Sequence, residues 1–313
     1  IERQYKRNGP IISLKDEVGE YFPNIKYEMY SENYWISNHT NLTKRVFNIL
    51  NNFRGKTFNI NNHFDIDKWA KYFAIIDLTG AYHGSLIKSV KLFYNPVSGL
   101  FEPIGHDLHK GAGIFDDFIL ADFLQEETKY NKISCSFICS HKEWYLKFFK
   151  LENGQINSDF VEKYIKYLIE YSDNFFIKNF ISLFDEELSL YNYAIYKDYS
   201  KTDRVNWIGA GFFVYDDEYI YNRAKLIRNR LMSSSLKNIE ISKIKDKVFF
   251  EDYQNSNFPF LATTIDCDNQ SDKKNFFLAG KMSFNLVTTC KKIKVSTYNG
   301  ESKILKLEEN III

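Results

Sequence analysis

The spacing of apolar residues between Leu42 and Leu78 most strongly limits how this chain can fold. Apolar side chains recur every three or four residues in two successive stretches, and this is the repeat of an amphipathic helix. The first stretch comprises Leu42, Val46, Ile49, Leu50 and Phe53, and the second comprises Ile66, Trp69, Tyr72, Phe73 and Ile76. Asp65 stands directly before the second stretch, where an N-cap residue is expected. We therefore predict two consecutive helices, the second capped by Asp65.

The periodicity changes after residue 89. Two short apolar runs, at 90–94 and 100–104, flank the sequence Asn95-Pro-Val-Ser-Gly99. Proline, glycine and asparagine at these places are typical of the turn that joins two antiparallel strands. The segment therefore predicts a β-hairpin, and the polar residues 105–109 follow its second strand directly.

Helical spacing resumes over 159–171, 176–195 and 219–231. The last of these stretches carries four basic residues, which we assign to a solvated helix face, with an acidic partner as the alternative. They are Arg223, Lys225, Arg228 and Arg230.

From about residue 235 the apolar residues alternate, and Asn299-Gly300 supplies a turn signal between two such runs. Alternation with period two is typical of strands that have one face buried. The sequence thus predicts a predominantly helical α+β fold. We expect a helical lobe with a hairpin over 1–234 and a small β-rich domain over 235–313.

Composition excludes some classes of function. The formal net charge is +1, so no overall field favours nucleic acid. The longest apolar runs, such as 73–76, are far shorter than the roughly 20 residues that a membrane-spanning helix needs. The 28 Phe and 22 Tyr are attributed to an AT-rich genome in preference to an aromatic binding surface.

The four cysteines are widely scattered and do not follow a zinc-binding pattern. Cys135 and Cys139 are expected to be buried free thiols. A Cys267–Cys290 bridge is the alternative to free thiols in the C-terminal part if the protein is exported.

Two polar sequences enclose the predicted hairpin and its preceding loop. Asp77-Leu-Thr-Gly-Ala-Tyr-His-Gly84 follows the second helix, and Asn95-Pro-Val-Ser-Gly-Leu-Phe-Glu-Pro-Ile-Gly-His-Asp107 spans the turn and second strand. This order resembles the core signature of the CotH spore-coat kinase family, in which Phe-Tyr-Asn-Pro-x-Ser/Thr-Gly precedes Glu-Pro-Ile-x-x-Asp. The match is close over 65–107 and looser over 158–195.

The resemblance implies the C-terminal lobe of a kinase-like fold, with the hairpin at its site. It also implies ATP and Mg²⁺ as cofactors, with Asp107 as a metal ligand, since Mg²⁺ takes oxygen ligands. A glycine-rich loop and its lysine would belong to an N-terminal lobe upstream of Ile1. A protein serine or threonine would be the substrate, and the location would be the spore coat, the cell surface or another extracytoplasmic place.

The sequence departs from the family at three positions. Gly84 stands where the loop Asp is expected, Ser89 where the metal-binding Asn is expected, and His109 where a second acidic residue often follows. His83, next to Gly84, is the candidate catalytic base, because imidazole has an unperturbed pKa near 6.5.

The remaining candidate roles follow from these positions. Ser89 and Lys91 are the candidate nucleotide-binding residues, and Asp107 and His109 are the candidate metal ligands. Each also has a structural alternative: Asp107 as a turn residue that caps its own backbone, His83 as a structural hydrogen-bond donor, and Lys91 as a solvated side chain.

Three functions remain open at this point. The first is a CotH-like protein kinase that depends on Mg²⁺ and ATP. The second is a non-catalytic relative that interacts with coat or cell-surface proteins. The third is a metal-dependent hydrolase, because imidazole and carboxylate groups suit zinc or iron. Its ligands would be His83, His106, Asp107 and His109.

Overall fold

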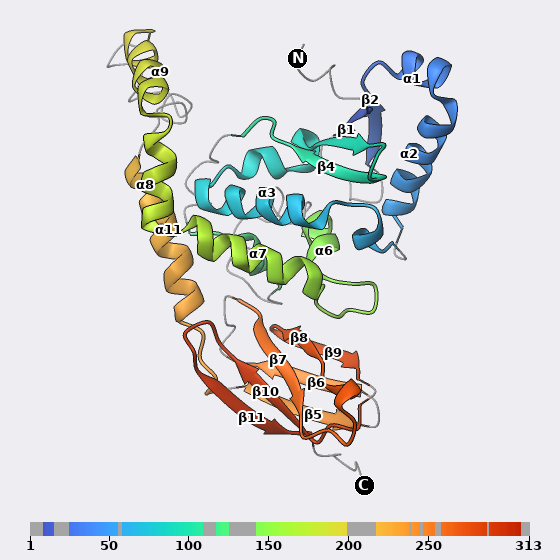
Figure 1. Cartoon of the computed structure of the whole chain (residues 1–313), viewed down its shortest axis with the longest axis vertical. Helices are drawn as coiled ribbons and strands as arrows, with labels where there is room; N and C mark the ends of the chain where they lie inside the picture. The colour runs from blue at the N-terminus through green and yellow to red at the C-terminus, as the bar shows by residue number, and fades with distance from the viewer. Residues whose placement is uncertain are drawn as a thin grey trace.

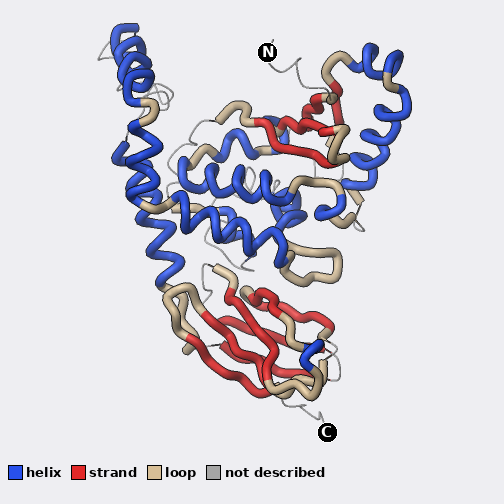
Figure 2. Tube along the Cα trace, in the orientation of Figure 1, coloured by secondary structure: helices blue, strands red, loops and turns tan. Residues whose placement is uncertain are grey.

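The computed structural model describes residues 9–15, 25–55, 58–108, 117–124, 142–198, 217–237, 239–244, 247–253, 258–286 and 288–307. Its α-helices and one small sheet form a body above a region that consists mainly of strands (Figure 1). Figure 2 shows that most of the helical residues lie in the upper body and that strands predominate in the C-terminal region. The predicted α+β class is therefore confirmed.

A four-stranded antiparallel sheet forms one side of the helical body. Its strand order is β2-β1-β3-β4, with β1 at Ile11–Lys15, β2 at Lys26–Met29, β3 at Lys91–Asn95 and β4 at Leu100–Ile104. The predicted hairpin is β3–β4, in which Phe93 lies opposite Glu102. Pairing of β1 with β3 brings the first described residues of the chain beside this hairpin.

Helices α2, α3, α7 and α11 form where the apolar repeat predicts them, and α3 and α7 are the central pair. Helices α1 and α6 were not predicted, and the stretch predicted over 176–195 forms two helices, α8 and α9, which a turn separates. They pack side by side and bury an aromatic core. Asp65 caps α3 as expected, since its side chain accepts a hydrogen bond from the Lys68 amide at 3.1 Å. The bounds are α1 Glu32–Asn38, α2 Thr40–Phe53, α3 Ile66–Thr79, α6 Lys142–Phe149, α7 Ser158–Tyr171, α8 Asn174–Ser182, α9 Asp185–Asp198 and α11 Asp217–Met232.

Many of the aromatic residues serve this core. The Trp69 and Phe148 ring centroids lie 4.9 Å apart, and Phe73 and Phe148 meet edge to face at 5.0 Å. Such pairs contribute about 0.5–1.5 kcal/mol each beyond the burial of their area. The abundance of phenylalanine and tyrosine thus has a structural use inside the helical body.

The C-terminal strands form two antiparallel sheets, with orders β11-β10-β7-β8 and β5-β6-β9. Val248, Phe250 and Ile293 belong to the separate core between them. Phe277 and Ala279, however, pack into the core of the helical body, so the domain boundary at residue 235 stays a prediction. The bounds are β5 Ile239–Ile244, β6 Lys247–Asp252, β7 Phe260–Ile265, β8 Asn275–Leu278, β9 Lys281–Asn285, β10 Lys292–Ser296 and β11 Ser302–Lys306.

A disulfide joins Cys267 to Cys290 in the β-rich region, as the exported alternative anticipated. The other two cysteines, Cys135 and Cys139, lie outside the described residues. Among the helices that the structure describes, none combines the length and the apolar character required to cross a membrane.

We expect replacement of both bridged cysteines by serine to lower the free energy of unfolding by about 2–4 kcal/mol, because the bridge closes a loop with a sequence separation of 23 residues. Thermal melting of the oxidised protein and of the Cys267→Ser/Cys290→Ser variant measures this difference. Identical melting temperatures would show that the bridge does not stabilise the folded protein.

Candidate functional site

The loop between α3 and β3 carries the first part of the candidate site. Helix α3 ends at Gly80, whose positive φ of 63° allows the chain to turn away from the helix axis. Two short 3₁₀ turns follow, η3 at Tyr82–Ser85 and η4 at Ile87–Ser89. They return the chain to the sheet at Lys91.

Tyrosine hydroxyl groups hold this loop against the helical core. The Tyr72 hydroxyl donates to the Gly84 carbonyl at 2.8 Å, and the Tyr145 hydroxyl lies 2.7 Å from Ser85 Oγ. All four residues are buried, and buried hydrogen bonds of this kind restrict the motion of the loop. The loop side chains are therefore positioned before any ligand arrives.

Three of the predicted site residues meet at one carboxylate oxygen. Asp107 Oδ2 lies 2.8 Å from His83 Nδ1 and accepts a hydrogen bond from Ser89 Oγ at 3.0 Å. Ser89 is buried, whereas 38% of the Asp107 side chain is exposed, so the cluster lies at the surface end of the loop. Asp107 has a positive φ of 55°, a conformation that aspartate tolerates better than most residues.

The contact with Asp107 determines which nitrogen of His83 can act as a base. A carboxylate at Nδ1 favours the tautomer that carries its proton there, which makes Nε2 the proton-accepting atom. Ser89 lies on the same side of the ring, 3.4 Å from Nδ1. This is not the arrangement of a serine nucleophile, which needs its hydroxyl at Nε2.

Lys91, another of the predicted site residues, does not join this cluster. The Lys91 ammonium contacts the Ser13 hydroxyl and lies 5.4 Å from the centroid of the Tyr30 ring. His109 lies outside the described residues. Within the described ranges, no three His, Cys, Asp or Glu residues are grouped so that they could hold a metal. The four-ligand hydrolase site gains no support from them.

Gly84 is required by close packing. A Cβ atom at this position would lie 2.7 Å from the His106 carbonyl oxygen and 2.4 Å from Leu108 Cδ2. The loop and the segment after β4 therefore touch at Gly84, and this approach also brings His83 to Asp107. The same packing leaves no room for an aspartate where the family resemblance expects one.

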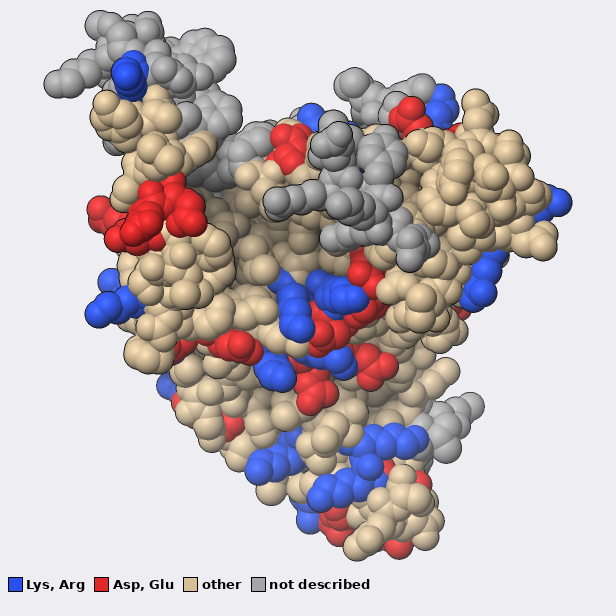
Figure 3. All heavy atoms as spheres, turned by 45° about the horizontal axis from the view of Figure 1, so that its top comes forward, with Lys and Arg blue, Asp and Glu red and all other residues tan. Residues whose placement is uncertain are grey.

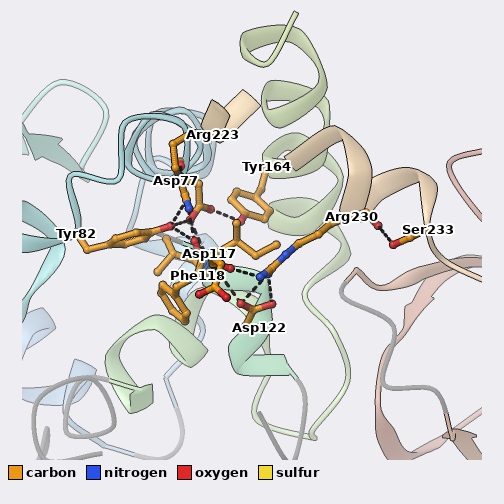
Figure 4. Close-up of polar contacts among 11 residues, drawn as sticks. Asp77, Tyr82, Asp117, Phe118, Asp122, Tyr164, Arg223, Arg230 and Ser233 are labelled. Carbon is orange, nitrogen blue, oxygen red and sulfur yellow. Dashed lines mark hydrogen bonds and ion pairs between the residues drawn. The ribbon is translucent and has the colours of Figure 1, made fainter. Parts of the chain in front are cut away.

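A second polar cluster lies in the core of the helical body, behind the loop (Figure 4). Asp77 on α3 is fully buried, and its carboxylate accepts from the Tyr82 hydroxyl at 2.7 Å and from the Leu120 amide at 2.9 Å. The Tyr164 hydroxyl donates to the other oxygen. We call this the Asp77 hub.

Arg223 on α11 completes the Asp77 hub. Its guanidinium donates to the Asp77 carbonyl oxygen at 3.0 Å from Nε and to the Phe118 carbonyl oxygen at 2.7 Å. The assignment of Arg223 to a solvated face is therefore wrong, since the residue is 2% exposed. It lies four residues before Ile227, on the apolar face of α11, and this spacing is the signal that the sequence analysis missed.

The same correction applies to Arg230, whereas Lys225 is exposed as expected. Arg230 Nη1 donates to both carboxylate oxygens of Asp122, at 2.7 and 2.8 Å, and both side chains are largely buried. Their mutual contact offsets part of the cost of burying the two charges, and burial still raises the pKa of Asp122. Arg223 and Arg230 together therefore hold residues 117–124 against α11.

Comparisons of the chain with protein-family models, with curated proteins and with solved structures find no match. The CotH resemblance therefore rests on the sequence motif alone.

Burial raises the pKa of Asp77 from 3.8 to about 6, although the tyrosine hydroxyls and Arg223 act in the opposite direction. Because the folded protein holds this proton more tightly than the unfolded chain, the contribution of Asp77 to stability falls as the pH rises from about 4 to about 6. The expected fall is on the order of 3 kcal/mol. We expect Asp77→Asn to remove this pH dependence.

Urea unfolding at pH 4.5 and pH 7 measures the change for the wild type and the variant. The exposed Asp159→Asn is the matched control and should keep the wild-type pH dependence. An unchanged slope in Asp77→Asn would contradict the expectation.

We expect Gly84→Ala to lower the free energy of unfolding by about 1–3 kcal/mol, because the added methyl group overlaps the His106 carbonyl oxygen. Gly105→Ala is the matched control, since its nearest neighbour is the flexible end of Leu108 at 3.0 Å. Chemical denaturation of both variants tests this. Equal losses would show that the Gly84 contact is not specifically tight.

Proposed function

We propose that this chain is a CotH-like, kinase-fold phosphotransferase lobe in which His83 accepts the proton of a substrate hydroxyl group. The observation that supports the proposal is the contact of His83 Nδ1 with Asp107 at 2.8 Å. A carboxylate in this position orients the ring and stabilises the imidazolium that forms after proton transfer. His83 would thus replace the loop aspartate whose place Gly84 occupies.

The oxygen atoms beside His83 fit a magnesium ion bound together with a nucleotide. Asp107 supplies a carboxylate and Ser89 a hydroxyl group, and these groups are already in contact. Mg²⁺ commonly takes one or two protein carboxylates and completes its shell with water and substrate phosphates. Asp107 and Ser89 would hold the ion, which would neutralise charge on the phosphates.

Lys91 stands two residues beyond Ser89, but it is directed toward β1. Its ammonium group would have to leave Ser13 and the Tyr30 ring to reach a phosphate. We therefore propose that Ser89 contacts the nucleotide in this lobe. Lys91 would contribute only a positive charge near the phosphates.

The proposed substrate is a serine or threonine of another protein. Its hydroxyl oxygen would form the new bond to the transferred phosphoryl group, and its proton would pass to His83 Nε2. We also propose an extracytoplasmic location, which the Cys267–Cys290 disulfide supports, since such bridges persist in oxidising compartments.

One observation favours the non-catalytic alternative. Gly84 is packed against the His106 carbonyl and Leu108, so the position of the expected loop carboxylate is filled by the protein itself. A relative that kept the fold and lost phosphoryl transfer would serve as an interaction partner of coat or cell-surface proteins.

ATP with Mg²⁺ is expected to raise the melting temperature of the protein by a few degrees, as ligand binding to the folded state requires. Asp107→Asn should remove this shift, because asparagine tolerates the positive φ but lacks the negative charge. Asp266→Asn is the matched control, since Asp266 is also an aspartate of positive φ, at 59°.

His83→Asn separates binding from transfer. The asparagine amide can keep the contact with Asp107 but has no group at the place of Nε2. We expect the thermal shift to persist and transfer of labelled phosphate to a protein substrate to fall about 10²–10⁴-fold. If neither Mg²⁺ nor Mn²⁺ with ATP produces a shift, the non-catalytic alternative holds.

A further inference from the structure

Helix α8 exposes large apolar side chains far from the His83–Asp107 pair in the sequence. Phe175 is 74% exposed, Leu183 is 73% exposed and Phe180 is 54% exposed. Single exposed apolar residues are ordinary, but a contiguous group of this size marks an interaction surface. Figure 1 shows α8 at the edge of the helical body, where it leads outward into α9.

A groove of about 710 Å³ runs along this surface, between α8, the end of α7 and α11. We call it the α8 groove. Its apolar lining consists of Ile169, Phe175, Phe176, Phe180 and Leu183.

Most of the apolar side chains of α8 are not buried by the rest of the chain. Ile177 is the one residue of this fully described helix that is buried. Phe176 and Phe180 on α8 and Phe184 in the turn after it form a ladder, with ring centroids 6.2 and 5.2 Å apart. A helix with apolar residues on several faces is stable when a second surface covers it.

The charges around the α8 groove are mainly acidic. Asp185, Glu186 and Glu187 begin α9 directly after Leu183 and Phe184, and all three are exposed. Figure 3 shows a compact group of acidic side chains beside the uncharged surface in this part of the molecule. At the other end, Arg228 is paired with Asp173 at 3.0 Å, so its charge is already balanced.

We propose that the α8 groove binds an amphipathic helix of a partner protein, one with an apolar face and flanking lysine or arginine residues. The ladder and groove match the spacing of a helix that anchors through residues three and four apart. The acidic start of α9 complements basic flanks and repels the anionic surface of a membrane. The proposal does not depend on phosphoryl transfer at His83.

A labelled amphipathic peptide of leucine and lysine, roughly 18 residues or five helical turns long, is the probe. The same peptide with glutamate in place of lysine is its counterpart. Fluorescence anisotropy with the full chain should show binding of the lysine peptide, weaker binding at high salt, and no binding of the glutamate peptide.

Two variants test the two parts of the surface separately. Phe175→Ser/Leu183→Ser and Glu186→Lys/Glu187→Lys should each weaken binding of the lysine peptide by roughly tenfold or more. The matched controls are Val97→Ser/Ile304→Ser, which removes exposed apolar groups elsewhere, and Glu152→Lys/Glu301→Lys, which reverses exposed charges elsewhere. Both controls should bind the peptide as the wild type does.

Several results would overturn the proposal. Equal binding of the lysine and glutamate peptides would show that the acidic residues do not select the partner. Equal effects of the test and control variants would show that the peptide does not bind in the α8 groove. Binding to phosphatidylcholine vesicles that Phe175→Ser/Leu183→Ser abolishes would assign the groove to a lipid surface. Self-association lost in the same variant, measured by sedimentation, would assign it to a second copy of the chain. Circular dichroism confirms that each variant is folded.

Discussion

The Asp77 hub is the interaction on which the helical body depends. One buried carboxylate and the carbonyl of the same residue receive donors from α7, from α11, from the loop after α3 and from residues 117–124. Segments far apart in the chain therefore meet at one residue. Removal of the Tyr164 hydroxyl would take away the donor to the second carboxylate oxygen of Asp77, and the loss of a partner in the buried core is expensive because the dielectric constant is low there.

The candidate site is built on the outer side of that arrangement. Tyr82 contributes its hydroxyl to the Asp77 hub, and His83 is the next residue, so the buried network also fixes the start of the loop that carries His83. Gly84 then allows the segment after β4 to approach closely enough for Asp107 to meet His83. The geometry of the site thus follows from the hydrogen bonds in the core and from the absence of a Cβ atom at Gly84.

Helix α11 connects this region with the α8 groove. Arg223 enters the Asp77 hub, and five residues later Arg228 lines the groove and pairs with Asp173. One rigid helix therefore contributes to both features. A partner helix in the groove would contact α11, the helix that supplies Arg223 to the Asp77 hub. The hub in turn holds Tyr82, the residue next to His83.

The sequence by itself determined α2, α3, α7 and α11, the β3–β4 hairpin and the β-rich end, because periodicity and turn residues act through neighbours along the chain. It did not indicate α1, α6 or the strands β1 and β2. It also indicated His83, Ser89 and Asp107 as site residues. Tertiary structure alone decided that these three share one carboxylate oxygen and that Lys91 turns toward β1. It also decided that Arg223 is buried, because the partners of a charge in the core come from distant segments that no local pattern reveals.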